Sequence, residues 1–106
     1  MKRIAVFCGA RAGKDDAYLP IAADAGHAIA RAGFGLVYGG GRVGMMGALA
    51  DAALAEGAEV IGVIPESLAT AEVAHRGITT LHIVGSMHER KALIVELSDA
   101  FIALFS

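Results

Sequence analysis

The sequence has little cysteine, few aromatic residues and no strong bias of charge. Cys8 is the only cysteine, so no disulfide can form within the chain. A protein without disulfides is typical of the cytoplasm, which is the location we expect. Nine Lys and Arg residues and eleven Asp and Glu residues are spread along the chain and give a formal net charge of −2. Because no basic stripe interleaved with aromatic residues is present, we do not expect nucleic acid as a partner.

Long apolar runs and clusters of metal ligands are also missing. The longest stretch without a charged residue extends from Gly77 to His88, well short of the roughly 20 apolar residues that span a bilayer. The sequence therefore predicts no membrane helix. The histidines (His27, His75, His82 and His88) show neither the spacing of a metal site nor a cysteine beside them. We expect neither a metal ion nor a cofactor.

Alanine is abundant, with 22 of the 106 residues, within an apolar content of 56%. So much alanine predicts closely packed helices. The length fits one domain, residues 1–106. A chain of this size buries only about 60–65% of the surface that it exposes when unfolded. The apolar excess therefore predicts that part of the surface is covered by another subunit, or by a segment outside this chain.

Apolar runs of strand length alternate with segments of helix length. Strands are predicted at residues 3–8, 35–38, 59–64, 80–84 and 100–104. Helices are predicted from about residue 15 to 32, from the glycine-rich loop to about residue 57, and from 86 to 98. Ser86 and Glu89 have the spacing of a capping box at the start of the last helix.

This alternation predicts a Rossmann-like three-layer αβα fold. Right-handed crossovers would make its five strands parallel, with helices on both faces of the sheet. The strands are apolar enough to be covered on both faces. We expect the strand order 3-2-1-4-5, numbered along the chain.

Glycines gather where the second predicted strand leads into a helix, in the segment 39–47 (GGGRVGMMG). Glycine lets the backbone approach an anion and adopt positive φ, and the N–H groups of a helix's first turn point at such an anion unpaired. A dinucleotide loop would follow the first strand. The segment therefore predicts a phosphate or mononucleotide site. The alternative is that its glycines only allow close packing of helix against strand.

Arg90 and Lys91 lie in the first turns of the last predicted helix, where a cation opposes the helix dipole at a cost of roughly 0.3–1 kcal/mol. They either face an anionic ligand at the carboxyl edge of the sheet or are compensated by Glu89 and solvent. Arg11 and Lys14, in the first loop, could join that site or be ordinary surface cations. For Cys8 we expect a buried structural thiol.

Taken in order, these segments resemble the LONELY GUY family of cytokinin riboside 5′-monophosphate phosphoribohydrolases, formerly described as lysine decarboxylases. The resemblance extends over the whole chain. It is carried by FCG at 7–9, YGGG at 38–41, GMMG at 44–47, VIP at 63–65 and MHERK at 87–91. These match the family's G-G-G-x-x-G-x-M-G and M-x-x-R-K elements.

The resemblance implies a nucleotide N-glycosidase that acts on cytokinin nucleotides or AMP as a homodimer. Arg90 would be catalytic and Lys91 a substrate contact, while Glu72 falls where the family has an acidic residue of the nucleotide site. The remaining substrate- or phosphate-binding positions carried over from the family motifs are Gly9, Gly40, Gly41, Gly44, Met45, Gly47 and Met87.

One departure concerns the family's P-G-G-x-G-T-x-x-E motif, which supplies a second phosphate loop and the catalytic glutamate. Here the last strand is followed by Phe105 and Ser106 only, so we expect the amino-terminal part of the family domain, incomplete on its carboxyl-terminal side. Cleaving a base–ribose bond needs a carboxylate, for which Glu72 and Glu89 are the candidates and neither is an obvious substitute. Two alternatives to the enzyme stay open: an inactive nucleotide-binding module or remnant, and a Rossmann-like carrier of a phosphorylated cofactor.

Overall fold

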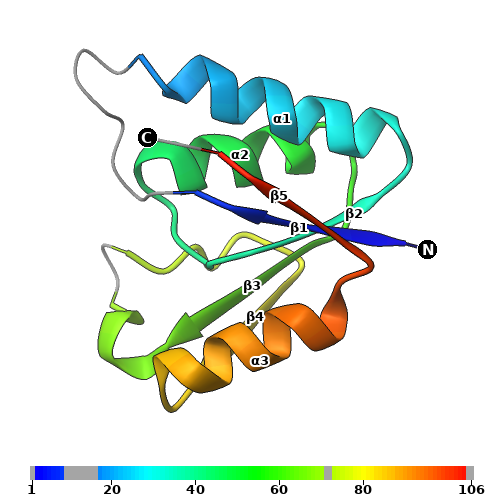
Figure 1. Cartoon of the computed structure of the whole chain (residues 1–106). Helices are drawn as coiled ribbons and strands as arrows, with labels where there is room; N and C mark the ends of the chain where they lie inside the picture. Colours follow the sequence, from blue (N-terminus) through cyan, green and yellow to red (C-terminus); the bar gives the residue numbers. More distant parts are fainter. Residues whose placement is uncertain (1, 9–16, 71–72, 105–106) are drawn as a thin grey trace.

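The computed structural model describes residues 2–8, 17–70 and 73–104 (Figure 1). Its strands are β1 (Arg3–Phe7), β2 (Gly35–Tyr38), β3 (Val60–Pro65), β4 (Thr80–Val84) and β5 (Ala100–Ala103). Its helices are α1 (Leu19–Arg31), α2 (Gly44–Ala55), the short 3₁₀ helix η2 (Glu66–Leu68) and α3 (Met87–Leu97). All four strand pairs are parallel, and α1 and α2 cover one face of the sheet while α3 covers the other. The predicted three-layer fold with a five-stranded parallel sheet is confirmed.

The strand order is β4-β3-β2-β1-β5, so the predicted order 3-2-1-4-5 is wrong. The fourth strand pairs with the third, and not with the first. The hydroxyl of Thr79 accepts a hydrogen bond from the N–H of Val60 at 2.9 Å, which ties the start of β4 to the start of β3. Ile78, just before it, is buried in the core between the sheet and helices α1 and α2. These two contacts add to the ladder between β3 and β4, which pairs Ile61 with Thr80 and extends to Pro65 and Val84.

The chain therefore reverses direction across the sheet between β1 and β5. From β1 to β4 each strand is added on the same side of the one before, and α3 then carries the chain back to the far side of β1. In open α/β sheets, ligands bind at the carboxyl ends of the strands beside such a reversal. The fold thus marks the carboxyl ends of β1 and β5 as the place to look for a site.

Helices α1 and α2 pack very closely, as the alanine content predicts. A Cβ on Gly26 of α1 would lie 2.3 Å from the carbonyl oxygen of Leu49 on α2, so only glycine permits this approach. Helix α1 ends before Gly33, whose φ of +86° is in the left-handed region that glycine adopts without strain. The predicted end of this helix is confirmed. Asp15 and Asp16, at its predicted start, lie outside the described residues.

The start of α3 is capped in a modified form of the predicted capping box. The hydroxyl of Ser86 accepts a hydrogen bond from the N–H of Glu89 at 3.1 Å, as expected. The carboxylate of Glu89 does not return to the N–H of Ser86; it accepts a hydrogen bond from the N–H of Gly85 at 2.8 Å. The negative charge therefore stays at the N-terminus of α3, where it favours the helix dipole.

Strand β5 differs from the expectation that the strands are covered on both faces. All four of its residues are exposed; it lies at one edge of the sheet and, among the described strands, pairs with β1 alone. The ring of Phe101 on β5 stacks on that of Phe7 on β1, with centroids 6.1 Å apart, and both remain at least 40% exposed. No helix in the described part of the chain is long and apolar enough to cross a membrane.

Candidate functional site

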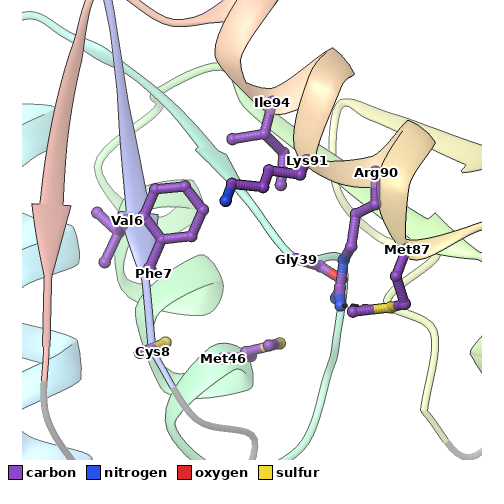
Figure 2. A pocket seen from close by; sticks show the side chains of 9 residues that line it. All are labelled: Val6, Phe7, Cys8, Gly39, Met46, Met87, Arg90, Lys91 and Ile94. Carbon is purple, nitrogen blue, oxygen red and sulfur yellow. Dashed lines mark hydrogen bonds between the residues drawn. The ribbon is translucent and has the colours of Figure 1, made fainter.

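A cavity of about 390 Å³ lies at the carboxyl ends of β1 and β2, under the start of α3. It lies at the expected carboxyl edge of the sheet and on one of the two strands at the reversal, β1, but none of its lining residues comes from β5. Helix α2 also contributes to its wall. The lining residues, all drawn in Figure 2, are Val6, Phe7, Cys8, Gly39, Met46, Met87, Arg90, Lys91 and Ile94.

Arg90 reaches from α3 to the ends of two strands. Its Nε donates a hydrogen bond to the carbonyl of Val63 at 2.9 Å, and its Nη2 donates to the carbonyl of Gly39. Pairing between β2 and β3 ends at Tyr38 and Gly62, so both carbonyls lie one residue beyond the last paired position. The guanidinium thus satisfies carbonyls that the strands leave free, and it is fixed at the rim of the cavity.

A side chain at position 39 would collide with this guanidinium. A Cβ on Gly39 would lie 2.5 Å from Nη2 of Arg90 and 2.9 Å from Cε of Met46. The backbone at Gly39 is not in the positive-φ region, so its conformation alone does not require glycine. The space taken by Arg90 explains this glycine.

The charges at the cavity are positive. Lys91 extends across the cavity towards Phe7 in Figure 2, and the lining described above contains two cations and no carboxylate. Burial lowers the pKa of Arg90, but a guanidinium remains protonated near neutral pH. Glu89 does not neutralise Arg90, because its carboxylate binds the N–H of Gly85. Within the described ranges no carboxylate forms an ion pair with Arg90 or Lys91, which favours an anionic ligand for this pair.

The glycine-rich loop that leads into α2 has a fixed shape. Gly40 and Gly44 have φ of +81° and +59°, as predicted for such a loop. Gly47 is required for another reason, because a Cβ there would lie 2.1 Å from the carbonyl oxygen of Arg42. Val43 occupies the N-cap position of α2 and offers no side-chain hydrogen bond. The N-cap side chain therefore leaves the first-turn N–H groups of α2 available, as in a helix that binds an anion.

The segment 73–75 holds the glycine-rich loop through backbone hydrogen bonds. The N–H of Arg42 donates to the carbonyl of Val73, and the N–H of His75 donates to the carbonyl of Gly40, both at 2.8 Å. Sequence reasoning does not find residues 73–75 because they contact the loop through backbone groups, which leave no pattern of residue types. The N–H of Arg42 is therefore engaged within the protein and is not a donor for a phosphate.

The structure brings together Met87, Arg90 and Lys91 from the predicted site. The side chain of Met45 is fully buried in the core, so it can offer a ligand only its backbone. Met46, which sequence reasoning did not select, lines the cavity in its place. The element G-G-G-x-x-G-x-M-G gives the signal that was missed, because its methionine falls on Met46 and not on Met45.

Cys8 also lines the cavity, directly after β1. Burial raises the pKa of its thiol from 9.0 to about 11, so it is protonated at neutral pH. This agrees with a structural thiol and argues against a nucleophile. Gly9 and Glu72, together with the loop cations Arg11 and Lys14, lie outside the described residues.

A model of the family described as "Possible lysine decarboxylase", the older description of the LONELY GUY proteins, matches residues 46–105, more than half of the chain. The chain belongs to the LONELY GUY family. The matched region includes most of α2, the strands β3 to β5 and the MHERK segment.

Relatives that match this LONELY GUY chain over most of its length are named cytokinin riboside 5′-monophosphate phosphoribohydrolases. The cytokinin riboside 5′-monophosphate phosphoribohydrolase of Rhodococcoides fascians is 58% identical over 104 residues, which are 97% of this chain and 52% of the relative. The enzyme LOG of Oryza sativa subsp. japonica, which has the same name, is 43% identical over 103 residues, 97% of this chain and 43% of the relative. The chain spans about half the length of the curated relatives it matches.

Solved structures support the fold. The molybdenum cofactor binding protein of Rippkaea orientalis matches with a TM-score of 0.82 at 23% identity, over 99% of this chain and 63% of that one. The Moco carrier protein of Chlamydomonas reinhardtii matches with a TM-score of 0.79 at 23% identity, over 99% of this chain and 62% of that one. At this level of identity the likeness shows a shared architecture only.

Proposed function

We propose that this LONELY GUY chain forms the nucleotide site of a phosphoribohydrolase that cleaves the bond between base and ribose 5′-monophosphate in cytokinin nucleotides or AMP. One observation carries the proposal: Arg90 and Lys91 line a cavity at the carboxyl edge of the sheet, and Met46 joins that cavity to the first turn of α2, whose N-cap residue provides no side-chain hydrogen bond. The 58% identity with the Rhodococcoides fascians phosphoribohydrolase supports the choice of reaction.

In this proposal the phosphate binds to the N–H groups at the start of α2. Gly40, Gly41, Gly44 and Gly47 shape the loop that presents them, and Lys91 provides a mobile positive charge over the cavity. Arg90, held by the strand ends, polarises the substrate or stabilises its charge as the bond breaks. The apolar part of the lining leaves room for ribose and base.

The chemistry also needs a carboxylate to stabilise an oxocarbenium-like centre or to activate water. The cavity lining within the described residues provides none. Glu89 is engaged at the start of α3, and Glu72 lies outside the described residues. We therefore expect this 106-residue chain to bind nucleotide and to hydrolyse it slowly. The same observation supports the second candidate, a nucleotide-binding module without turnover.

The test combines AMP binding by calorimetry with chromatographic detection of free adenine, using the purified 106-residue protein. We expect measurable binding and adenine release close to background. Arg90→Ala should weaken binding, whereas Arg31→Ala, which removes an exposed cation that pairs with Glu56 on another part of the surface, should not. Absence of AMP binding would contradict the nucleotide site. Adenine release at an ordinary enzymatic rate that Arg90→Ala stops would show that a carboxylate of this chain acts, and would refute slow turnover.

We further propose that the chain self-associates as a homodimer in the cytoplasm, with its helices in the interface. Apolar side chains exposed on α3 support this, since Met87 is 59% and Val95 50% exposed. The single cysteine supports the location. Light scattering at micromolar concentration tests the association, and a monodisperse monomer would contradict it. The likeness to molybdenum cofactor proteins does not favour a carrier function, because it extends to the fold alone.

A further inference from the structure

His75 lies outside the cavity, yet both of its ring nitrogens are engaged. Its side chain is only 14% exposed. Nε2 is 2.7 Å from Oδ1 of Asp51 on α2, and Nδ1 is 3.1 Å from the backbone N of Gly77. A backbone N–H can only donate, so Nδ1 is the acceptor and Nε2 carries the proton that is donated to Asp51. The hydrogen bonds thus select one tautomer of the ring.

The backbone of the same residue holds the glycine-rich loop. The N–H of His75 donates to the carbonyl of Gly40, and Gly41 forms an isolated antiparallel bridge with Ala74. The buried hydroxyl of Tyr38 donates to the carbonyl of Gly41 at 2.7 Å from the sheet side. Two successive carbonyls of the loop are therefore fixed in direction.

The contact with Asp51 closes a ring of interactions. The loop leaves β2 at Gly39 and enters α2 at Gly44, and Asp51 lies two turns further along that helix. His75 connects the first part of the loop, at Gly40, to the helix that the loop enters. The loop is thus connected to α2 at two places, by the chain itself at Gly44 and by the His75–Asp51 hydrogen bond.

We propose that His75 is a positioning residue: by linking the segment 73–75 to Asp51, it holds the glycine-rich loop in the shape that presents the first-turn N–H groups of α2 to a phosphate. This inference rests on the proposed nucleotide site. His75 itself does not touch the nucleotide.

Two conservative substitutions separate the two hydrogen bonds of the ring. In His75→Gln the side-chain amide nitrogen can reach the place of Nε2 and donate to Asp51. In His75→Asn the side-chain oxygen can take the place of Nδ1 and accept from Gly77, but the side chain is too short for Asp51. His75→Gln therefore keeps only the hydrogen bond to Asp51, His75→Asn keeps only the one from Gly77, and His75→Ala removes both hydrogen bonds.

The test measures AMP affinity by calorimetry and amide hydrogen exchange of Arg42 and His75 by NMR, at a temperature where circular dichroism shows every variant folded. We expect His75→Asn and His75→Ala to weaken AMP binding about tenfold, as for the loss of a charge-assisted hydrogen bond. Hydrogen exchange of the amides at positions 42 and 75 should become faster in both variants. His75→Gln should restore both readouts to within about threefold of the parent protein. A merely structural role would lower thermal stability without changing the affinity of the folded protein.

Equal AMP affinity in His75→Asn and the parent protein would overturn the inference, and so would a His75→Gln variant as impaired as His75→Asn. If the parent protein does not bind AMP, the proposed nucleotide site fails, and with it the role of His75 towards phosphate. Hydrogen exchange still decides whether His75 holds the loop. Unchanged exchange of Arg42 in His75→Asn shows that it does not.

Discussion

Replacing Gly39 by alanine should displace Arg90 from the rim of the cavity. The new Cβ would lie 2.5 Å from Nη2 of Arg90, far inside van der Waals contact. The other close contact, 2.9 Å to Cε of Met46, involves the end of a flexible side chain that can move away. The substitution therefore acts on the hydrogen bond from Arg90 to the Gly39 carbonyl.

The expected loss follows from that bond. A hydrogen bond from a charged donor contributes about 1.5–3 kcal/mol, and the opening of the cavity lets water replace part of it. We expect Gly39→Ala to lower the free energy of unfolding by about 1–2 kcal/mol, which corresponds to a Tm decrease of about 5–10 °C for a domain of this size. AMP affinity should fall as well, because the guanidinium is no longer held in place.

A double-mutant cycle by urea unfolding, with Gly39→Ala, Arg90→Ala and the double variant, tests this reasoning. In the Arg90→Ala background the clash is gone, and alanine should be neutral or slightly stabilising because it restricts the unfolded chain. The coupling energy should therefore reach about 1 kcal/mol or more. If Gly39→Ala destabilises both backgrounds equally, Arg90 is not the reason for glycine at this position.

Three further predictions concern the loop, the thiol and an ion pair. Gly44→Val should abolish AMP binding measured by calorimetry, because a β-branched residue resists a φ of +59°; unchanged affinity would mean that the loop is only structural. Burial raises the pKa of Cys8 from 9.0 to about 11, so the unfolded thiol ionises first and the free energy of unfolding should fall between pH 9 and 11; urea unfolding should show that Cys8→Ala removes this part of the fall, and an identical pH profile would contradict it. The hydrogen bond from Arg3 at 2.9 Å lowers the pKa of Glu59, so its stabilisation is present above the unfolded value of 4.5 and is lost as the pH falls below it. Glu59→Gln should therefore flatten the acid limb of the stability curve by up to about 1 kcal/mol, and an unchanged limb would show that the pair contributes nothing.

Much of the local structure follows from the sequence by itself. Apolar runs of four to six residues bounded by glycine, proline or charged residues predict the strands, including β5, whose residues are exposed in the structure. Gly33 and Ser86 mark the end of one helix and the start of another through their own backbone and side-chain chemistry. Arg90 and Lys91 lie in the first turns of α3, where their charges oppose the helix dipole. This unfavourable placement can be recognised from the sequence, and it indicates the anion-binding side of the cavity.

Tertiary structure alone decided the strand order and the surroundings of the site. Every parallel order with right-handed crossovers gives the same alternation along the chain, so the place of β4 beside β3 depends on tertiary contacts such as those of Ile78 and Thr79. The bonds from Arg90 to strand-end carbonyls and from His75 to the glycine-rich loop use backbone acceptors, which every residue type offers alike. Such contacts leave no trace in residue identity and arise only when the folded sheet brings distant segments to one edge.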